Sequence, residues 1–531
     1  MSNQQVDVVV VGAGFGGLYA LHKLRGLGFS VQGFETGSDV GGTWFWNRYP
    51  GARCDVESMD YSYSFDPELE QDWNWTERFA TQPEILSYLN HVADRYALRP
   101  LIRFNTRVEA ARWSAERARW SVTAQDGSVW EARFLILATG SLSAAATPDI
   151  PGLASFAGET VSTSNWPEGG VSVAGKRVGV IGTGSSGIQA IPVLAEEAKQ
   201  LTVFQRTPTF SLPARNAMLS DAYIAAFKAN YRTYRSAMRE TVVGVRYRTT
   251  GKRALSVDAA ERQARFEEVW AEGGPGLVNI FSDLLFDPAA NVTAADFVRQ
   301  KIRTIVEDKE TAETLCPTDY PIGSKRVAVD TNYYATFNRP NVVLKDLRKT
   351  PLERVTPEGV LLSSGLVELD TLVLATGFDA LTGSFLRIDI QGRNGQTLRE
   401  KWSAGPRTFL GLMSAGFPNL FCVAGPGSPS VLSNMVLSSE QHVEWIADCL
   451  CAMREAGLDT IEAAPEAEER WVDDVTAAAQ RTLYMSGNSW YLGANVPGKP
   501  RVFMPYMGGV SEYRRICNEV AATGYAGFHR A

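Results

Sequence analysis

Two glycine-rich turns constrain this sequence more than any other feature. The segments VDVVVVGAGFGGLYALHKL, near the N-terminus, and GKRVGVIGTGSSGIQAIPVLA, from Gly175, repeat one design. In each, a run of β-branched residues meets a G-x-G-x-x-G turn, and a helix-like apolar pattern follows. A continuous apolar run such as Val8 to Val11 suits a strand buried on both faces of a parallel sheet. The sequence therefore predicts an α/β fold with two Rossmann-like dinucleotide-binding domains.

The first glycine turn has the features of a flavin site. Gly12, Gly14 and Gly17 stand between a predicted strand and helix, where bare backbone can approach a pyrophosphate. Glu35 ends the next apolar run, SVQGFE, at the distance expected of a ribose-binding carboxylate. Because a carboxylate accepts hydrogen bonds from ribose hydroxyls and repels a 2′-phosphate, this turn should hold FAD or NAD rather than NADP.

The second glycine turn predicts a different nucleotide. Gly182, Gly184 and Gly187 repeat the spacing, but the following run, LTVFQRT, ends in Arg206 and Thr207 instead of an acidic residue. An arginine there can hold a 2′-phosphate with paired charge-assisted hydrogen bonds, which selects NADPH over NADH. The alternative is a solvated arginine at a strand end. The other residues expected to contact this nucleotide are Thr183, Ser185, Ser186 and Gln189. The two turns together imply hydride transfer from NADPH to a tightly held flavin.

The order of these segments predicts how the chain divides into domains. Two further apolar runs, FLILATGS and TLVLATGFD, read as buried strands that end at ligand-facing turns. We expect an FAD-binding domain built from both ends of the chain, with a second domain and a mostly helical insertion between them. The boundaries are 1–142 and 376–531 for the FAD domain, 143–212 and 322–375 for the NADPH domain, and 213–321 for the insertion.

Composition excludes several other classes of protein. The net charge of -7 offers no basic surface for nucleic acid. No apolar run is long enough for a membrane span, and the apolar start lacks the basic residues of a targeting segment. Six scattered cysteines and four histidines show neither C-x-x-C nor metal-ligand spacing, so we expect no metal site and no disulfide framework. These features predict a cytoplasmic protein.

Several separated motifs carry a family resemblance. GGTWFWNRYPGARCD (41–55), YPIGSKR (320–326), ATGFD (375–379), AGPGSPSVLSNM (424–435) and SWYLGANVPGKPRVF (489–503) together resemble the flavin-dependent Baeyer–Villiger monooxygenases over nearly the whole chain. The resemblance implies FAD and NADPH as cofactors, with a ketone and O2 as substrates. It implies that a C4a-peroxyflavin attacks the ketone carbonyl and inserts oxygen beside it, giving an ester or lactone.

The resemblance also implies roles for individual residues. Arg326 would be the catalytic cation, because arginine stays protonated and can stabilise the peroxide and the carbonyl oxygen without delivering a proton. Asp55 would be its partner, since a buried guanidinium without a carboxylate carries a heavy desolvation cost. Lys325 would reach the 2′-phosphate beside Arg206 and Thr207. The other cofactor contacts implied are Gly42, Thr43, Trp44, Asp55, Tyr61 and Trp490.

A segment of small and apolar side chains should line the substrate pocket. The residues that match the family's pocket are Ser430, Val431, Leu432 and Met435, and Cys54 and Leu142 are further candidates. Ordinary packing is the alternative role for each of them. Such a lining predicts a small-molecule ketone of modest polarity. We expect a monomer or weak oligomer with no nucleic-acid or membrane partner.

One position departs from the family pattern F-x-G-x-x-x-H-x-x-x-W-P. The sequence reads FAGETVSTSNWP, with Ser162 in place of histidine, in what should be the link between the nucleotide domains. Serine is shorter and never cationic near neutral pH, so NADPH coupling is in question. The alternatives are an S- or N-oxygenating flavin monooxygenase, an uncoupled NADPH oxidase and a nucleotide-binding sensor. A disulfide reductase is disfavoured, because the chain lacks C-x-x-C.

Overall fold

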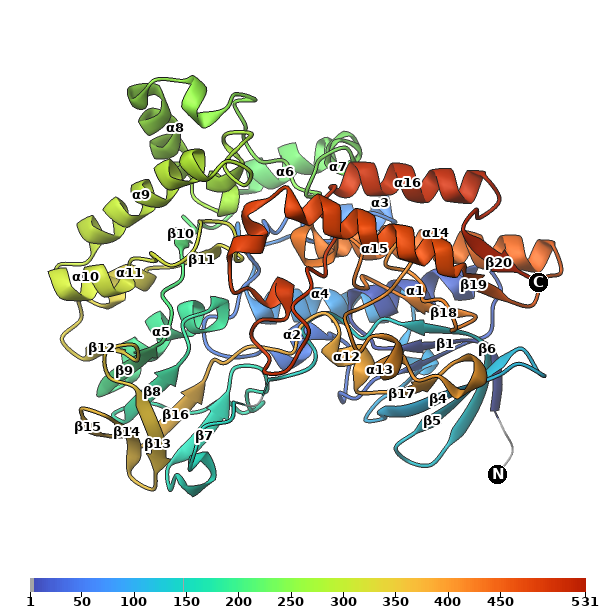
Figure 1. Cartoon of the computed structure of the whole chain (residues 1–531), viewed down its shortest axis with the longest axis horizontal. Coiled ribbons are helices and arrows are strands. Elements are labelled where there is room, and N and C mark those ends of the chain that lie inside the picture. Colours follow the sequence, from blue (N-terminus) through green and yellow to red (C-terminus); the bar gives the residue numbers. More distant parts are fainter. Residues whose placement is uncertain (1–3, 147) are drawn as a thin grey trace.

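Both ends of the chain contribute to one sheet. A computed structural model describes residues 4–146 and 148–531, and Figure 1 places the C-terminus at the same end of the molecule as this sheet. The strand order is β17-β4-β5-β6-β1-β2-β3, with β18 paired to β6. The strands are β1 (Gln4–Val11), β2 (Val31–Phe34), β3 (Ile102–Arg103), β4 (Val108–Ser114), β5 (Arg119–Ala124), β6 (Val129–Leu137), β17 (Asp389–Gln391) and β18 (Leu420–Cys422). β1 is parallel to β2 and β6, as expected for a dinucleotide-binding fold.

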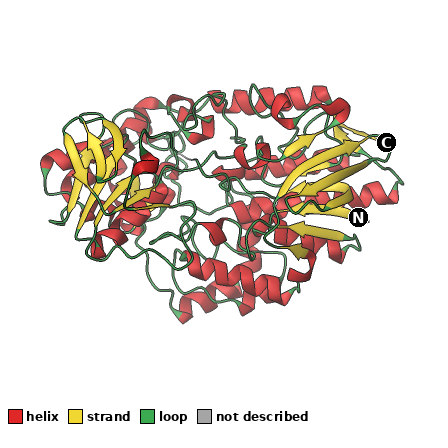
Figure 2. Ribbon diagram, turned by 90° about the horizontal axis from the view of Figure 1, so that it is seen from below, coloured by secondary structure: helices red, strands yellow, loops and turns green. Residues whose placement is uncertain are grey.

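A second, wholly parallel sheet lies at the opposite end of the molecule (Figure 2). Its order is β12-β9-β8-β16-β7. The strands are β7 (Glu159–Ser162), β8 (Arg177–Ile181), β9 (Gln200–Gln205), β12 (Val342–Asp346) and β16 (Thr371–Leu374). Both apolar runs that end in ATG are therefore inner strands, β6 in the first sheet and β16 in the second. The expected α/β fold with two Rossmann-like units is confirmed.

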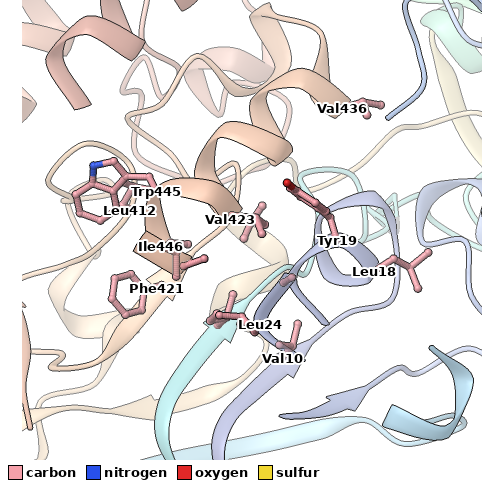
Figure 3. Packing of buried hydrophobic residues seen from close by; sticks show 14 of the residues in the cluster. Val10, Leu18, Tyr19, Leu24, Leu412, Phe421, Val423, Val436, Trp445 and Ile446 are labelled. Atoms are coloured by element: carbon pink, nitrogen blue, oxygen red, sulfur yellow. The ribbon is translucent and has the colours of Figure 1, made fainter. Parts of the chain in front are cut away.

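Helices cover the sheets where the sequence is apolar. α1 (Phe15–Gly26) follows the first glycine turn and packs against α14 (Met435–Glu455). Figure 3 shows Tyr19 and Leu24 of α1 on the side of Val423 and Ile446, and all four residues belong to this core. Segments from the two ends of the chain thus share one core. In the second domain, α5 (Ser185–Glu197) follows the second glycine turn and packs against β8 and β9.

The insertion is helical, and a pair of short strands joins its two ends. Its helices are α6 (Asp221–Ala229), α7 (Tyr231–Arg239), α8 (Ala259–Glu272), α9 (Pro288–Ile305) and α10 (Lys309–Leu315). Side chains of Ser220, Asp258, Asp287 and Asp308 accept backbone N–H groups at the starts of α6, α8, α9 and α10, which explains where these helices begin. β10 (Ser211–Pro213) pairs with β11 (Ala328–Asp330) on either side of the insertion. The expected boundary at 212 falls inside β10, so we propose Pro213 instead.

The remaining elements complete the two domains. They are α2 (Thr43–Trp46), α3 (Pro67–Asp72), α4 (Gln82–Arg95), α11 (Tyr333–Thr336), α12 (Gly383–Leu386), α13 (Leu398–Lys401), α15 (Pro465–Gln480), α16 (Val510–Ala522), β13 (Leu352–Thr356), β14 (Gly359–Leu362), β15 (Gly365–Glu368), β19 (Ile461–Ala463) and β20 (Phe528–Arg530). Among the described residues, no helix combines the length and apolar character that crossing a membrane requires. The other domain boundaries stay predictions.

One loop joins the two hydrophobic cores. Tyr49 and Ala52 belong to the core of the second domain, whereas Cys54 and Val56 belong to that of the first. We call residues 49–56 the bridging loop. Asp55 lies between Cys54 and Val56, three residues after Ala52. Its position is therefore fixed by packing on both sides.

The expectation that Ser162 lies in a link between domains is wrong. Ser162 ends β7, which pairs with β16 at the edge of the second sheet. Its Oγ lies 2.8 Å from the Oγ of Ser164. Trp166, from the same motif, is buried in the core of the second domain. The segment folds into this domain because its β-branched residues Thr160 and Val161 pair in register with β16.

A buried carboxyl group ties α14 to the first domain. Glu440 accepts hydrogen bonds from the backbone N–H and hydroxyl of Ser64, at 2.6 and 2.7 Å, and from the N–H of Phe65 at 3.1 Å. Burial raises the pKa of Glu440 to about 7. The nearby charge of Arg235 opposes this shift, whereas that of Glu444 adds to it. Glu440 is therefore a carboxyl that, in the folded protein, titrates near neutral pH.

We expect Glu440→Gln to weaken the pH dependence of stability. A carboxyl whose folded pKa is raised stabilises the fold fully below its ordinary pKa, and this contribution falls as pH rises towards 7. The loss is at most about 3 kcal/mol. Melting temperatures at pH 5, 6, 7 and 8 should fall less steeply for the variant. Asp60, with a pKa raised to about 6 by burial, leaves some pH dependence in both proteins. Identical pH courses would contradict the prediction.

Candidate active site

The first glycine turn leaves no room for side chains. A Cβ on Gly12 would overlap the carbonyl oxygen of Ala138, and one on Gly17 would overlap that of Gly12. The turn therefore packs directly on the ATG segment that follows β6. Gly14 caps α1 without a side-chain hydrogen bond, so the first N–H groups of the helix stay available to an anion.

Glu35 stands at the end of β2, where the sequence predicts a ribose-binding carboxylate. Its Oε2 accepts the N–H of Ala13 and its Oε1 the N–H of Gly37, both at 2.8 Å. Burial raises the pKa of Glu35, and these hydrogen bonds oppose the shift. Each carboxylate oxygen has a second lone pair, so a ribose hydroxyl can still be accepted. The protein's own contacts thus orient Glu35.

Residues 41–44 pack against the first glycine turn. A Cβ on Gly42 would press on the Cα of Gly14, and Gly41 donates its N–H to the carbonyl of Ala13 at 3.0 Å. Thr43 then begins α2. The indole N–H of Trp44 points at the hydroxyl of Tyr61, at 3.2 Å. The structure therefore brings all five predicted residues Gly14, Gly42, Thr43, Trp44 and Tyr61 together.

The second glycine turn repeats this geometry on the second sheet. A Cβ on Gly182 would overlap the carbonyl oxygen of Ala375, and one on Gly187 would overlap that of Gly182. Gly184 caps α5 without a side-chain hydrogen bond, and the predicted residues Ser185 and Ser186 form its first turn. Thr183 donates its hydroxyl to the carbonyl of Thr207 at 3.1 Å. Each ATG segment thus lies beside one glycine turn.

Two cations, Arg206 and Lys325, gather beside the second turn. Arg206 is exposed just beyond β9, and neither it nor Lys325 forms an ion pair among the residues that the structure describes. Burial and the charge of Arg206 lower the pKa of Lys325, and the weaker influence of Asp319 opposes them. Lys325 Nζ lies 4.1 Å from the ring centroid of Tyr320. Like charges held this way favour an anionic ligand such as a phosphate.

Arg326, the neighbour of Lys325, has the opposite electrostatic surroundings. Its Nε and Nη2 donate to the two carboxylate oxygens of Asp55 at 2.6 and 2.7 Å, a bidentate pair. Its Nη1 donates to the carbonyl of Val431 at 2.8 Å. Side-chain exposures of 32% for Arg326 and 22% for Asp55 leave part of the pair open to a ligand. The predicted contact between these two residues is present.

Burial and pairing act in opposite directions on this ion pair. Burial disfavours both charges, but Arg326 holds the pKa of Asp55 below its ordinary value, and Asp55 raises that of Arg326 well above its own. Both groups therefore stay ionised. The hydroxyls of Tyr247 and Tyr491 lie close enough to act on the guanidinium, and burial raises the pKa of both phenols. The site is a fixed cation among neutral phenols.

Sequence reasoning missed these two tyrosines. Tyr491 lies inside the SWYLGANVPGKPRVF motif, beside the predicted Trp490, and could have been named from that motif. Tyr247 comes from the irregular segment between α7 and α8, where no pattern points to a site. Only the tertiary fold brings this part of the insertion to Arg326.

The predicted pocket residues fall into different surroundings. Val431, Leu432 and Met435 share an apolar cluster with Tyr491 and Trp490. The structure thus places Trp490 with the pocket segment, and its nucleotide contact stays a prediction. Ser430 is wholly buried, and its hydroxyl lies 3.1 Å from the carbonyl oxygen of Ala424, which favours a structural role. Cys54 precedes Asp55 in the bridging loop, but no hydrogen bond or apolar cluster of the described residues links Leu142 to Arg326.

Comparisons with known proteins fit this geometry over the full chain. A steroid monooxygenase structure with bound NADP has a TM-score of 0.96 and 54% identity, with 99% of each chain covered. A Baeyer–Villiger monooxygenase of Pseudooceanicola batsensis is 43% identical over 99% of this chain and 96% of the relative. This chain belongs to the Baeyer–Villiger monooxygenase family. A phenazine N-monooxygenase of Lysobacter antibioticus is also 43% identical, over 98% of this chain and 96% of that protein.

A family model covers the N-terminal part of this Baeyer–Villiger family member. The pyridine nucleotide-disulphide oxidoreductase model matches residues 6–260, which include both glycine turns. Because the chain contains no C-x-x-C, the match describes its dinucleotide-binding architecture and not dithiol chemistry.

We expect Asp55→Asn to destabilise the protein by leaving Arg326 without a countercharge. The cost should be about 1–3 kcal/mol, below the value for a fully buried pair because both side chains are partly exposed. The matched control is Glu512→Gln, which breaks the exposed pair of Glu512 with Arg515 on α16. Thermal melting should show a clear decrease for Asp55→Asn and almost none for the control. Equal melting temperatures for all three proteins would contradict this prediction.

Proposed function

We propose that this protein uses NADPH and O2 to convert ketones into esters or lactones, with FAD at the first glycine turn and NADPH at the second. The observation that carries the proposal is the bidentate pair of Arg326 with Asp55, held where the two cores meet. Full-length family membership supports it.

The residues at the first turn fit FAD. The bare N-terminus of α1 suits a pyrophosphate, and Glu35 suits a ribose. When bound, the flavin supplies hydride acceptance and the activation of oxygen. Trp44 and Tyr61 would enclose it on the side of the bridging loop. At the second turn, Arg206 and Lys325 would hold the 2′-phosphate of NADPH.

The protein's contribution to the chemistry is a fixed positive charge. Attack on a ketone moves negative charge onto the carbonyl oxygen, and a guanidinium directed at that oxygen stabilises it most in the transition state. Asp55 and the carbonyl of Val431 fix three of the five N–H groups of Arg326, which leaves two for substrate. Since the pKa of Arg326 is raised well above its ordinary value, it stabilises charge without transferring a proton.

The phenazine N-monooxygenase relative supports a second candidate, N-oxygenation. Oxygen transfer to a soft nucleophile creates no carbonyl oxyanion and so needs no cation beside it. The Arg326 and Asp55 pair therefore favours ketone oxidation. Ser162 bears on the uncoupled-oxidase and sensor alternatives, but its hydroxyl contacts Ser164 at the end of β7, and the pair is formed without it. The expected cytoplasmic location and monomeric or weakly associated state stay predictions.

Arg326→Ala should separate reduction from oxygenation. With FAD and NADPH present, we expect oxidation of NADPH under air to continue, while ester formation falls at least about 100-fold, because one charge-stabilising donor group is lost. Hydrogen peroxide should account for the missing product. The measurement is gas chromatography of esters together with a peroxide assay, using aryl, cyclic and linear ketones. Arg112→Ala, which breaks a surface pair with Asp389, is the control.

The wild-type protein also decides between the two candidates. Each ketone should be offered beside a thioether and an N-heteroaromatic compound. Sulfoxide or N-oxide without any ester would overturn the proposed function, and so would an Arg326→Ala variant that makes normal amounts of ester.

Arg206→Ala should reduce the preference for NADPH over NADH. The 2′-phosphate loses a charge-assisted hydrogen bond, so the KM for NADPH should rise by about tenfold or more while that for NADH changes little. Steady-state kinetics with both coenzymes provide the measurement. Lys176→Ala, just before β8 at the far end of the same sheet, is the control. An unchanged ratio of the two KM values would place the 2′-phosphate elsewhere.

A further inference from the structure

The side chain of Gln189 connects the two domains. It projects from α5, and its Oε1 accepts the hydroxyl of Tyr49 at 2.8 Å and the N–H of Arg53 at 3.3 Å. Its Nε2 donates to the carbonyl of Arg53 at 3.1 Å. Both lone pairs of the amide oxygen and one N–H are thus used by the bridging loop. The expected contact between Gln189 and NADPH competes with these three hydrogen bonds.

The helix and the bridging loop are also in backbone contact. Gly51 has φ +80, and a Cβ there would overlap the carbonyl oxygen of Gln189. Burial raises the pKa of Tyr49 to about 12, so its hydroxyl remains a donor at any working pH. Only glycine allows this close approach. A shift of the loop along α5 would break the three hydrogen bonds of Gln189.

Arg53 is held from the opposite side by the first domain. Its Nη1 donates to Glu77 Oε2 at 2.5 Å and to the carbonyl of Phe79 at 2.9 Å. Its side chain therefore belongs to the first domain, while its backbone is held by Gln189 of the second. Asp55 lies two residues further along the chain. A displacement of α5 acts directly on the segment that sets the position of Asp55.

We propose that Gln189 is a positioning residue that couples occupancy of the second glycine turn to the placement of Asp55 and, through it, of Arg326. α5 begins at this turn, so a bound nucleotide fixes the end of the helix that lies next to Gln189. The hydrogen bonds of Gln189 then transmit that position to the bridging loop. The inference deepens the proposed function and rests on it for its catalytic consequence.

The first test needs no ketone. NADP⁺ is added to the FAD-loaded protein, and amide hydrogen exchange of residues 49–56 is followed by mass spectrometry. In the wild type, NADP⁺ should slow this exchange by about fivefold or more, the effect of about one hydrogen bond's stabilisation. In Gln189→Met, which keeps the side-chain length without the hydrogen bonds, the response should disappear although NADP⁺ still binds. Gln189→Glu keeps the acceptor contacts and should respond partially.

Asn341, which contacts the other end of α5, provides a matched control. Asn341 donates its Nδ2 to the carbonyls of Ala195 and Ala198, both at 2.9 Å, without reaching the first domain. Asn341→Ala should therefore keep the wild-type response. The inference would be overturned if NADP⁺ still slowed amide exchange of the bridging loop in Gln189→Met. Loss of this response in Asn341→Ala would overturn it as well.

The second test measures turnover. In Gln189→Met, oxygenated product per NADPH consumed should fall by about fivefold, with hydrogen peroxide in its place, while the KM for NADPH changes by less than about twofold. A raised KM with unchanged product yield would identify Gln189 as a nucleotide contact and refute the positioning role. If the wild type oxygenates no ketone, the proposed function fails, whereas the exchange test still decides the coupling.

Discussion

The ion pair of Arg326 with Asp55 sets the main constraint on the whole architecture. A partly buried guanidinium is stabilised by a carboxylate, and the carboxylate must be presented in a fixed geometry for both oxygens to accept. Asp55 meets this requirement because the bridging loop is anchored in both cores. Arg326 arrives from the other side, just before β11. The charge at the centre of the site therefore depends on how the two domains fit together.

This arrangement explains why so much of the chain serves one contact. The first sheet places Trp44 and Tyr61 beside the bridging loop, and the insertion supplies Tyr247. The C-terminal part adds the carbonyl of Val431 and the phenol of Tyr491. No single domain holds a complete site. A site assembled from several segments can respond to ligands that move any one of them, which a site within one rigid core could not do.

The sequence predicts local structure well and assembly less well. Both glycine turns, the strands around them and the helical insertion follow from the periodicity of the sequence and from positions whose backbone geometry only glycine accepts. Gly12 and Gly182 are two such positions. The contact between Asp55 and Arg326 was predicted only by resemblance, since residues so distant in sequence share no local pattern. Tyr247 was missed and Ser162 was misplaced for the same reason, because strand pairing and loop packing are tertiary facts. Gln189 was predicted to contact the nucleotide because it follows the second glycine turn in the sequence.

Lys325 and Arg326 illustrate how partners, and not residue type, decide the role of a charge. Both are cations on adjacent residues. Arg326 is paired with Asp55, which keeps it ionised and fixes its direction, so its remaining N–H groups suit a carbonyl oxygen that becomes negative only during reaction. Lys325 faces Arg206, and the two cations repel each other. Such a pair is stabilised when a permanent anion binds between them, because the repulsion becomes attraction. Adjacent residues thus carry two separate tasks, because their side chains have different neighbours.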